Sequence, residues 1–244
     1  MQVVLLAAGL GSRLGALTKD IPKALIRVAG KPLLFHALEF VARLRPAQVV
    51  VVAGYGFPLV ARALEQDRAS SPALAGLSID LVENTSFRDG NLISLLRARP
   101  LIFQGFLLLN VDHIYRPAIA DVVAPEVAEV TAFIDTDRKL GGDDMKVERT
   151  PDGRVRRIAK TLTGFDAGYV GMTRVPAAAL ARYWQTADAA LAQEGRAIHV
   201  ERILARLAET DAAPLCRDIS GHGWLEVDTP EERAAAERAL MAAG

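Results

Sequence analysis

The chain begins with a short apolar run that ends in a glycine-rich turn, and these two features constrain the fold most strongly. Residues 3–8 are all apolar, and glycines follow at positions 9, 11 and 15. Unbroken apolar runs of this length are typical of strands that are buried on both faces of a parallel sheet. Amphipathic segments and further apolar runs alternate after the turn. This alternation predicts an α/β fold.

The spacing of apolar residues predicts where the elements lie. In the first half we expect strands at 3–8, 48–55, 77–84 and 106–115, and helices at 32–44, 58–66 and 91–99. In the second half we expect strands at 130–137, 145–150, 155–160, 166–173 and 224–229, with a turn at 151–153 and helices at 199–209 and beginning at Pro176 and Pro230. We therefore predict a three-layer α/β/α sandwich with a mostly parallel, mixed central sheet. Without a repeat or a low-complexity linker, residues 1–244 are expected to form one domain, in which 1–115 bind a nucleotide and 116–244 complete the sheet.

Composition excludes several classes of function. The 244 residues include 29 basic and 29 acidic side chains, so we expect no broad electrostatic attraction to nucleic acid or to an anionic membrane. No apolar run is long enough to span a bilayer, and no basic segment precedes the first apolar run, which argues against a signal peptide and against membrane insertion. Cys216 is the single cysteine, so no intrachain disulfide can form. We expect a cytoplasmic protein.

Three interpretations compete for the glycine turn. A dinucleotide fingerprint needs GxGxxG and an acid after the second strand, but this turn is one residue too long and residues 53–55 read Ala-Gly-Tyr. A purely structural turn has no use for Arg13 and Lys23. The third interpretation is a loop that wraps a nucleoside triphosphate. Small residues leave room for base and ribose, backbone N–H groups meet phosphate oxygens, and the cations supply charge. The residues expected to bind the nucleotide here are Leu6, Ala7, Ala8, Gly9, Gly11 and Ser12.

A family resemblance supports the triphosphate interpretation. The stretch GLGSRLGALTKDIPKAL, followed by AGKPLL at 29–34, resembles the signature of nucleotidyltransferases that activate sugar and alcohol phosphates. In that family the arginine and lysine of the signature bind the triphosphate and stabilise charge as pyrophosphate leaves. The resemblance implies catalytic roles for Arg13 and Lys23 and a Rossmann-like nucleotidyltransferase fold.

Two distant aspartates are candidate metal ligands. Asp112 follows an apolar strand, where α/β proteins bind ligands, although it could simply cap a turn. The resemblance implies that Asp112 binds a metal ion; the family usually has Gly-Asp, so Val111 is a departure. Asp228 could be a helix cap. Cytidylyltransferases acting on inositol phosphate or phosphocholine end with a similar Val-Asp-Thr segment, whose aspartate is the second ligand. Mg²⁺ suits such oxygen donors.

The segment ENTSFRDGNLISLL at 83–96 lies where this family recognises the base. The sugar-phosphate branch has a glutamine or a Gly-Gly-rich turn there. The branch that uses CTP has an asparagine, then Gly-Asn or Asn-Asn, then Ser-Leu. Four residues match the second branch: Asn84, Gly90, Asn91 and Ser94. Alternatively, Asn91 or Asp89 only caps the following helix.

The acceptor-binding residues are expected near the hairpin of the second half. VERTPDGRVRRIAKTL resembles the matching region of inositol-phosphate cytidylyltransferases, in which one lysine should hold the acceptor phosphate. We expect this role for Lys146 and Lys160, and we expect Asp166 to contact the acceptor or to cap a turn.

These features predict an enzyme that transfers a nucleotidyl group, preferably CMP from CTP, to a small phosphorylated or phosphonylated alcohol with release of pyrophosphate. Inositol 1-phosphate, phosphocholine and aminoethylphosphonate are all possible acceptors, and the sequence does not choose among them. A sugar-1-phosphate uridylyl-, thymidylyl- or guanylyltransferase is the nearer alternative. A non-catalytic regulatory module that binds a nucleotide is the more distant one. A homo-oligomer is compatible with the sequence.

Overall fold

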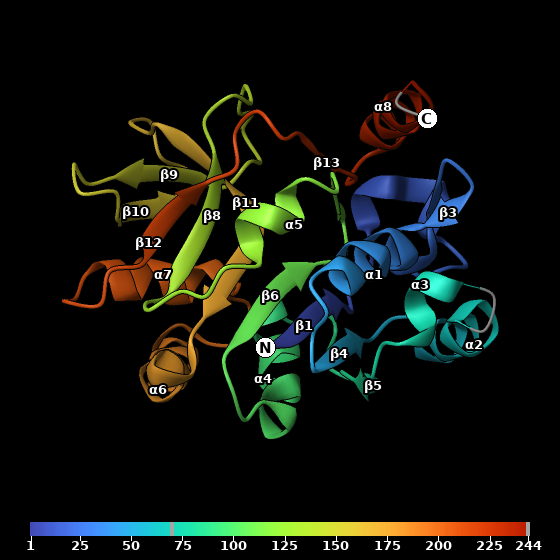
Figure 1. The fold of residues 1–244 in the computed structure, drawn as a ribbon, viewed down its shortest axis with the longest axis horizontal. Helices are drawn as coiled ribbons and strands as arrows, with labels where there is room; N and C mark the ends of the chain where they lie inside the picture. Colours follow the sequence, from blue (N-terminus) through green and yellow to red (C-terminus); the bar gives the residue numbers. More distant parts are fainter. Residues whose placement is uncertain (69–70, 243–244) are drawn as a thin grey trace.

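In a computed structural model, which describes residues 1–68 and 71–242, strands from both halves of the chain share one central sheet (Figure 1). Nine strands of the described residues form it, in the order β10-β9-β11-β6-β1-β4-β5, with β8 paired to β11 and β12 paired to β8. The strands are β1 (Gln2–Ala7), β4 (Gln48–Ala53), β5 (Ile79–Glu83), β6 (Phe106–Asn110), β8 (Thr131–Asp135), β9 (Lys146–Arg149), β10 (Val155–Ala159), β11 (Ala167–Val175) and β12 (Leu215–Asp218). Helices cover both faces, which confirms the predicted sandwich.

The two halves build the sheet differently. β1 is central in the first half and pairs in parallel with β4 and β6, so that Leu5 lies beside Val51 on one side and Leu109 on the other. β11 adds the second half by pairing antiparallel with β6, β8 and β9. The hairpin predicted at 151–153 connects β9 and β10, and Gly153 has the positive φ of 79° that such a turn favours.

Alternation along β1 creates a core on each face of the sheet. Val3, Leu5 and Ala7 belong to one buried cluster, and Val4 and Leu6 belong to the other, because successive side chains of a strand point to opposite faces. The first cluster is covered by α1 (Leu33–Arg43), α2 (Phe57–Arg68), α3 (Pro72–Ala75), α5 (Ile119–Val123) and α8 (Pro230–Met241). The second is covered by α4 (Asn91–Ala98), α6 (Leu180–Glu194) and α7 (Glu201–Ala208).

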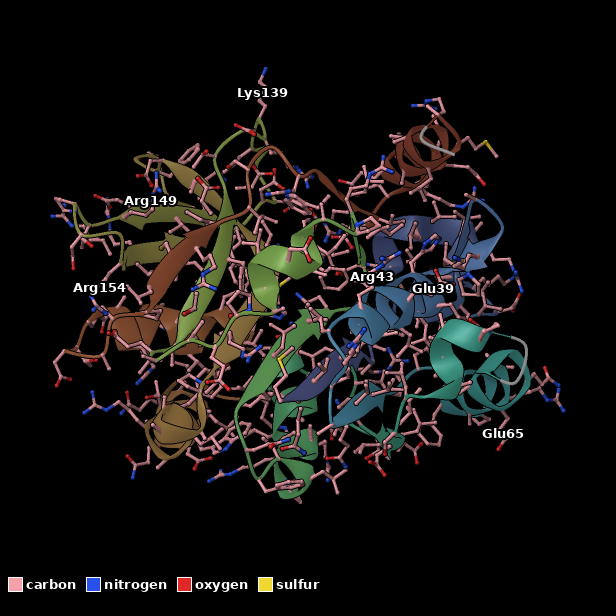
Figure 2. The ribbon with its side chains drawn as sticks, in the orientation of Figure 1. Glu39, Arg43, Glu65, Lys139, Arg149 and Arg154 are labelled. Atoms are coloured by element: carbon pink, nitrogen blue, oxygen red, sulfur yellow. The ribbon has the colours of Figure 1, made fainter. Side chains whose placement is uncertain are left out.

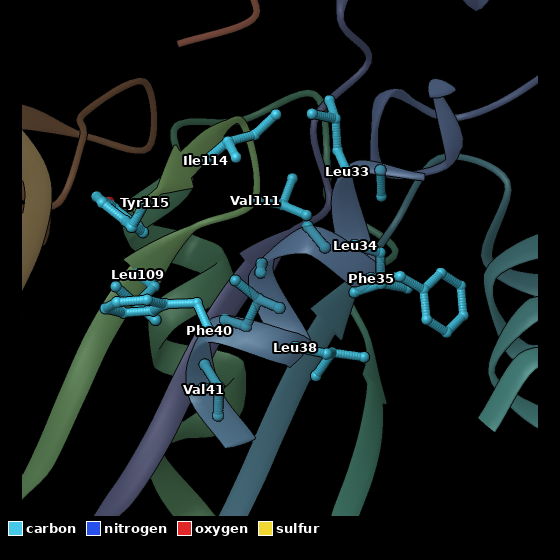
Figure 3. Close-up of a cluster of buried hydrophobic side chains, with 14 of the residues drawn as sticks. Leu33, Leu34, Phe35, Leu38, Phe40, Val41, Leu109, Val111, Ile114 and Tyr115 are labelled. Atoms are coloured by element: carbon cyan, nitrogen blue, oxygen red, sulfur yellow. The ribbon is translucent and has the colours of Figure 1, made fainter. Parts of the chain in front are cut away.

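The prediction of a single strand at 106–115 is wrong. It divides at Val111 and Asp112 into β6 and β7 (His113–Tyr115), and β7 leaves the main sheet to pair antiparallel with β13 (Trp224–Glu226). Val111 is buried in one cluster with Leu33 and Leu34 of α1 (Figure 3). Its side chain therefore serves the core, which explains how the chain accommodates valine where the family usually has glycine.

Several smaller elements were not predicted, among them α3 and α5. A short hairpin, β2 (Arg27–Val28) and β3 (Lys31–Pro32), precedes α1, and 3₁₀ turns lie at Ser12–Thr18 and Lys23–Leu25. Strand β12 was missed because its residues lack a sustained apolar pattern. The helix expected from residue 199 begins at Glu201, which leaves His199 in the preceding loop.

Charged side chains gather at the periphery. Lys139 extends outward from the loop after β8, and Arg149 and Arg154 lie near the edge formed by β9 and β10 (Figure 2). Arg154 pairs with Glu129 and Asp152, as ordinary surface charges do. Among the described residues, no helix combines the length and the apolar composition that crossing a membrane requires.

Candidate active site

The glycine turn folds back so that Lys23 lies beneath it. Gly11 has a φ of 67°, and a Cβ at this position would lie 2.8 Å from the Cβ of Lys23. Only glycine accepts both the conformation and this close approach. Thr18 Oγ1 donates a hydrogen bond of 2.9 Å to the Gly11 carbonyl and holds the turn closed. A Cβ at Gly9 would meet no atom within 4 Å, so the backbone there faces open space.

The ribbon of β7 and β13 brings the two aspartates to the same place. His113 lies opposite Glu226 in this ribbon, and Val227 N donates to the Asp112 carbonyl at 3.0 Å. Asp228 follows directly, immediately before α8. Two aspartates 116 positions apart in sequence thus meet because a two-stranded ribbon closes the edge of the cleft.

Asp228 does not cap α8. The cap is Thr229, whose side chain accepts a hydrogen bond from Glu232 N, while the Glu232 carboxylate accepts from Thr229 N. This capping box fixes the start of the helix without the Asp228 carboxylate. The carboxylate is therefore available to the cleft.

Four charged groups form one cluster at this point. Lys23 Nζ donates to Asp112 Oδ2 at 2.7 Å and also to Asp228 Oδ1. Arg13 donates to Asp228 Oδ2 through one guanidinium nitrogen and pairs with Asp143 at 3.1 Å through the other. The Lys23 ammonium is buried, so its contacts with Asp112 and Asp228 form with little competition from water, whereas the Arg13–Asp143 pair is exposed.

The cluster keeps its members charged. Burial lowers the pKa of Lys23, but the carboxylates of Asp112 and Asp228 outweigh burial, and the pKa lies above its ordinary value. Burial raises the pKa of Asp112, but Lys23 and His113 together hold that pKa well below its usual range. His113 forms a 2.6 Å hydrogen bond with Asp112 and stacks on Trp224, with ring centroids 5.2 Å apart. These contacts fix the direction of the Asp112 carboxylate.

The donor set suits a hard divalent cation. Two carboxylates from separate elements converge, and both are ionised or paired with cations. Among the described residues, no group of three or more histidine, cysteine or acidic side chains could enclose a metal ion by itself. An ion held by Asp112 and Asp228 would complete its shell with water or phosphate oxygens, which is the usual arrangement for Mg²⁺.

A cavity of about 310 Å³ opens over the cluster. It lies beyond the carboxyl ends of β1 and β6, where open α/β sheets bind their ligands. Twelve of the residues predicted from the sequence line it: Leu6, Ala8, Gly9, Gly11, Ser12, Arg13, Lys23, Asn91, Ser94, Asp112, Lys160 and Asp228. The glycine turn, both aspartates and part of the expected base site thus share one space.

Three predicted nucleotide-binding residues lie behind the cavity wall. Ala7 points into the core on the opposite face from Leu6 and Ala8. Asn84 is buried, and its amide donates to Ser94 Oγ at 2.9 Å, so it supports Ser94 from behind. Gly90 lies against the neighbouring loop, where a Cβ would come within 1.8 Å of the Ile198 carbonyl oxygen.

Neither Asn91 nor Asp89 caps α4. The N-cap of α4 is Gly90, without a side-chain hydrogen bond, and Asp89 forms an ion pair with Arg196. Asn91 Oδ1 instead accepts from Val200 N at 2.8 Å and holds the start of α7 against α4.

Two predicted acceptor-binding residues also lie outside the cavity. Lys146 is buried and donates to the Lys160 carbonyl at 2.7 Å. Asp166 pairs with Arg149 at 3.0 Å. Both side chains therefore stabilise the hairpin region, and Lys160 alone of the predicted acceptor residues faces the cavity.

Several lining residues were not singled out from the sequence. They are Asn110, Val111, His113, Asp143, Asp144, Met145, Tyr169, Gly171, His199, Glu201 and Glu226. Gly171 carried a usable signal, because a glycine inside an apolar strand often marks a close approach of another group. In the structure its φ is 68°, and a Cβ there would lie 2.7 Å from the His113 ring. Glu201 and His199 carried none, because an acid at the start of a helix and a nearby histidine are common anywhere.

Comparison with known proteins agrees with this geometry. Residues 3–213 match the family described as the MobA-like NTP transferase domain. A bifunctional IPC transferase and DIPP synthase from Aquifex aeolicus is 28% identical over 245 residues, covering 98% of this chain and 51% of that protein. A CMP-5'-(3-aminopropyl)phosphonate synthase from Streptomyces rubellomurinus is 36% identical over 135 residues, covering 54% of this chain and 20% of that protein.

A solved structure gives the same fold. The inositol-1-phosphate CTP transferase from T. maritima superposes with a TM-score of 0.81 at 20% identity, covering 99% of this chain and 94% of that one. The present chain spans about half the length of the bifunctional relatives, or less. Since the family match extends over most of the sequence, this chain belongs to the MobA-like NTP transferase domain family.

Proposed function

We propose that this chain transfers CMP from CTP to a small phosphorylated or phosphonylated alcohol and releases pyrophosphate. The observation that carries the proposal is the placement of Lys23 between Asp112 and Asp228, in one cavity with the glycine turn. The names of its relatives, an IPC transferase, a CMP-phosphonate synthase and an inositol-1-phosphate CTP transferase, support the nucleotide and the acceptor class.

The reaction is an in-line displacement at the α-phosphorus. An oxygen of the acceptor phosphate attacks, the new P–O bond forms, and the bond to the bridging oxygen of pyrophosphate breaks. The acceptor oxygen is already anionic near neutral pH, so no general base is required. The main obstacles are the repulsion between anions and the charge that develops on the leaving oxygen.

The residues of the cluster would reduce the repulsion between anions and stabilise the charge on the leaving oxygen. Arg13 and Lys23 supply fixed positive charge to the triphosphate, and the turn at Gly9–Ser12 offers backbone N–H groups to its oxygens. Asp112 and Asp228 would hold Mg²⁺, which would neutralise phosphate charge when bound. A bound triphosphate would give Arg13 and Lys23 new anionic partners, which would leave the carboxylates of Asp112 and Asp228 available to hold a metal ion.

Base selection is assigned to the wall formed by α4. Ser94 and Asn91 face the cavity, and Asn84 fixes the Ser94 hydroxyl by donating to its oxygen. The second lone pair of the Ser94 oxygen is left to accept from an amino group of the base, such as N4 of cytosine, and the Ser94 proton is left to donate to a ring acceptor. Hydrogen-bonding groups of this kind distinguish the N4 amino group of cytosine from the O4 of uracil.

A pyrophosphate-release screen tests the proposal. CTP, UTP, dTTP and GTP are each combined with inositol 1-phosphate, phosphocholine, aminoethylphosphonate and glucose 1-phosphate. We expect release with CTP and a small non-sugar acceptor. Preference for UTP or dTTP with glucose 1-phosphate would support the sugar branch. Nucleotide binding without turnover on any acceptor would indicate a regulatory module.

A further inference from the structure

The second half of the chain contributes a separate wall of the cavity. Lys160 follows β10, Tyr169 lies in β11, and Glu201 is the first residue of α7. Met145 and His199 complete this wall. The residues come from four segments and line the same cavity as the glycine turn. None of them is among the residues proposed above to bind the triphosphate.

Glu201 differs from the other acids that line the cavity. Asp112 and Asp228 are paired with Lys23, and Asp143 is paired with Arg13. Asp144 and Glu226 both pair with Arg138. Within residues 1–68 and 71–242, no cation lies within ion-pair distance of the Glu201 carboxylate.

Lys160 is also unpaired. Its carbonyl oxygen accepts from Lys146, but among the described residues its ammonium forms neither an ion pair nor a hydrogen bond. Lys160 and Glu201 line the same cavity without forming an ion pair with each other. The wall therefore presents one exposed cation and one half-buried anion, neither of them in an ion pair with the described residues.

An unpaired carboxylate in this position is unfavourable until a ligand compensates it. Burial is the main influence on the pKa of Glu201 and raises it, and the charge of Asp112 raises it further. The backbone N–H of Glu201 and the charges of His199 and Lys160 lower the pKa. The net pKa lies above the ordinary value. Burial is the main cause that raises the phenol pKa values of Tyr169 and Tyr183, and the Glu201 charge raises them further. A cation from the ligand would remove this penalty, whereas a neutral group would leave the charge in place.

We propose that the acceptor is a zwitterion whose phosphate or phosphonate binds Lys160 and whose protonated amine binds Glu201. The inference rests on the proposed nucleotidyl transfer and names its acceptor class. Lys160 and Glu201 match the two charges of such a molecule, and a polyol phosphate would leave Glu201 uncompensated. The ring of Tyr169 and the side chain of Met145 offer an aromatic face and an apolar surface to a short alkyl chain that bears an ammonium.

The test compares acceptors that differ only at the amine. Pyrophosphate release with CTP is measured for 2-aminoethyl and 3-aminopropyl phosphonates and for their hydroxyalkyl counterparts, with inositol 1-phosphate and phosphocholine as further arms. The wild-type chain is compared with Glu201→Gln, which keeps the shape and removes the charge. Glu209→Gln is the matched control, because Glu209 lies exposed at the other end of α7.

We expect the wild-type chain to favour an amine over its hydroxyl counterpart by about 30-fold in kcat/KM, the ratio for one well-placed charged contact. Glu201→Gln should reduce that ratio to within about threefold, mostly by raising KM for the amine, while Glu209→Gln leaves the ratio unchanged. A quaternary amine such as phosphocholine should also depend on Glu201 if charge dominates over hydrogen bonding.

Each other result counts against the inference. Equal use of amine and hydroxyl acceptors by the wild-type chain, or a preference for inositol 1-phosphate, overturns it and leaves nucleotidyl transfer intact. An equal loss on both acceptors in Glu201→Gln assigns Glu201 a structural role and also overturns it. If Glu201→Gln does not fold, the wild-type comparison still decides. Absence of release with every acceptor and nucleotide would instead refute the proposed function.

Discussion

The two walls of the cavity treat their charges in opposite ways. On the wall of the glycine turn, Arg13 and Lys23 are already paired with the aspartates before any ligand is bound. On the opposite wall, Lys160 and Glu201 are unpaired within the described residues. The first wall holds its cations in internal ion pairs, which the proposed binding of a triphosphate and a metal ion would replace. The second holds charged groups without such pairs, and the proposed zwitterionic acceptor would contact these groups.

The largest effect is expected from Lys23→Ala. Removing this ammonium deletes the charge that stabilises the leaving pyrophosphate, so we expect kcat to fall about 100- to 1,000-fold. The variant should remain folded but be less stable, because Asp112 would lose its lysine partner and Asp228 would keep only Arg13. Pyrophosphate release and circular dichroism measure the two effects. Lys19→Ala, in an exposed position of the same turn, is the control, and full activity of Lys23→Ala would remove that residue from the mechanism.

Gly11→Ala should disturb the first wall through its backbone. The positive φ and the 2.8 Å approach to Lys23 force the turn to shift, at about 1–3 kcal/mol of stability. We expect a lower melting temperature and weaker binding of CTP by calorimetry. Gly76→Ala is the control, since its φ is not positive and a Cβ there meets no atom within 4 Å. An unchanged melting temperature in Gly11→Ala would show that the turn adapts.

Thr229→Ala removes the cap of α8 and tests how firmly Asp228 is held. Loss of the capping box should lower the free energy of unfolding by about 1 kcal/mol and the melting temperature by about 2–4 °C. Activity should fall only a few-fold, because Asp228 keeps its ion pairs with Lys23 and Arg13. Thermal melts and the metal concentration needed for half activity would report both effects. A change in neither would mean that the ribbon of β7 and β13 alone positions Asp228.

The smallest effect is expected from Asp166→Asn, which tests whether the wall with Lys160 and Glu201 also includes Asp166. Asp166 pairs with Arg149 outside the cavity, and surface pairs contribute about 0–1 kcal/mol. We expect kcat/KM for every acceptor to stay within about twofold of the wild-type value, in contrast to Glu201→Gln. A selective loss on one acceptor would return Asp166 to the binding site that the sequence suggested.

The sequence was most informative where neighbouring residues act together. The buried strand, the glycines and the cations Arg13 and Lys23 are contiguous, so their joint role follows from local spacing and from the family signature. The helices were predicted from their periodicity, with ends shifted by a few residues. The division of the 106–115 strand escaped prediction because apolar residues continue on both sides of Asp112, and only pairing with β13 separates β7 from β6.

The second wall was less predictable. From the sequence we expected acceptor contacts for Lys146, Lys160 and Asp166. In the structure only Lys160 lines the cavity, because Lys146 donates to a backbone carbonyl and Asp166 pairs with Arg149. Glu201 and His199 had no motif at all. Their importance depends on the packing of α7 against the sheet and on which charges remain unpaired after packing.

The amino-acid sequence by itself determined the layered α/β architecture and the charge of the triphosphate turn, because periodicity and local motifs act over a few residues. Tertiary structure alone decided that Asp112 and Asp228 share Lys23, and that Glu201 lines the cavity without an ion pair to any described residue. Such contacts join residues far apart in the chain. Their energies depend on burial and on the distance between charges, which no local pattern encodes.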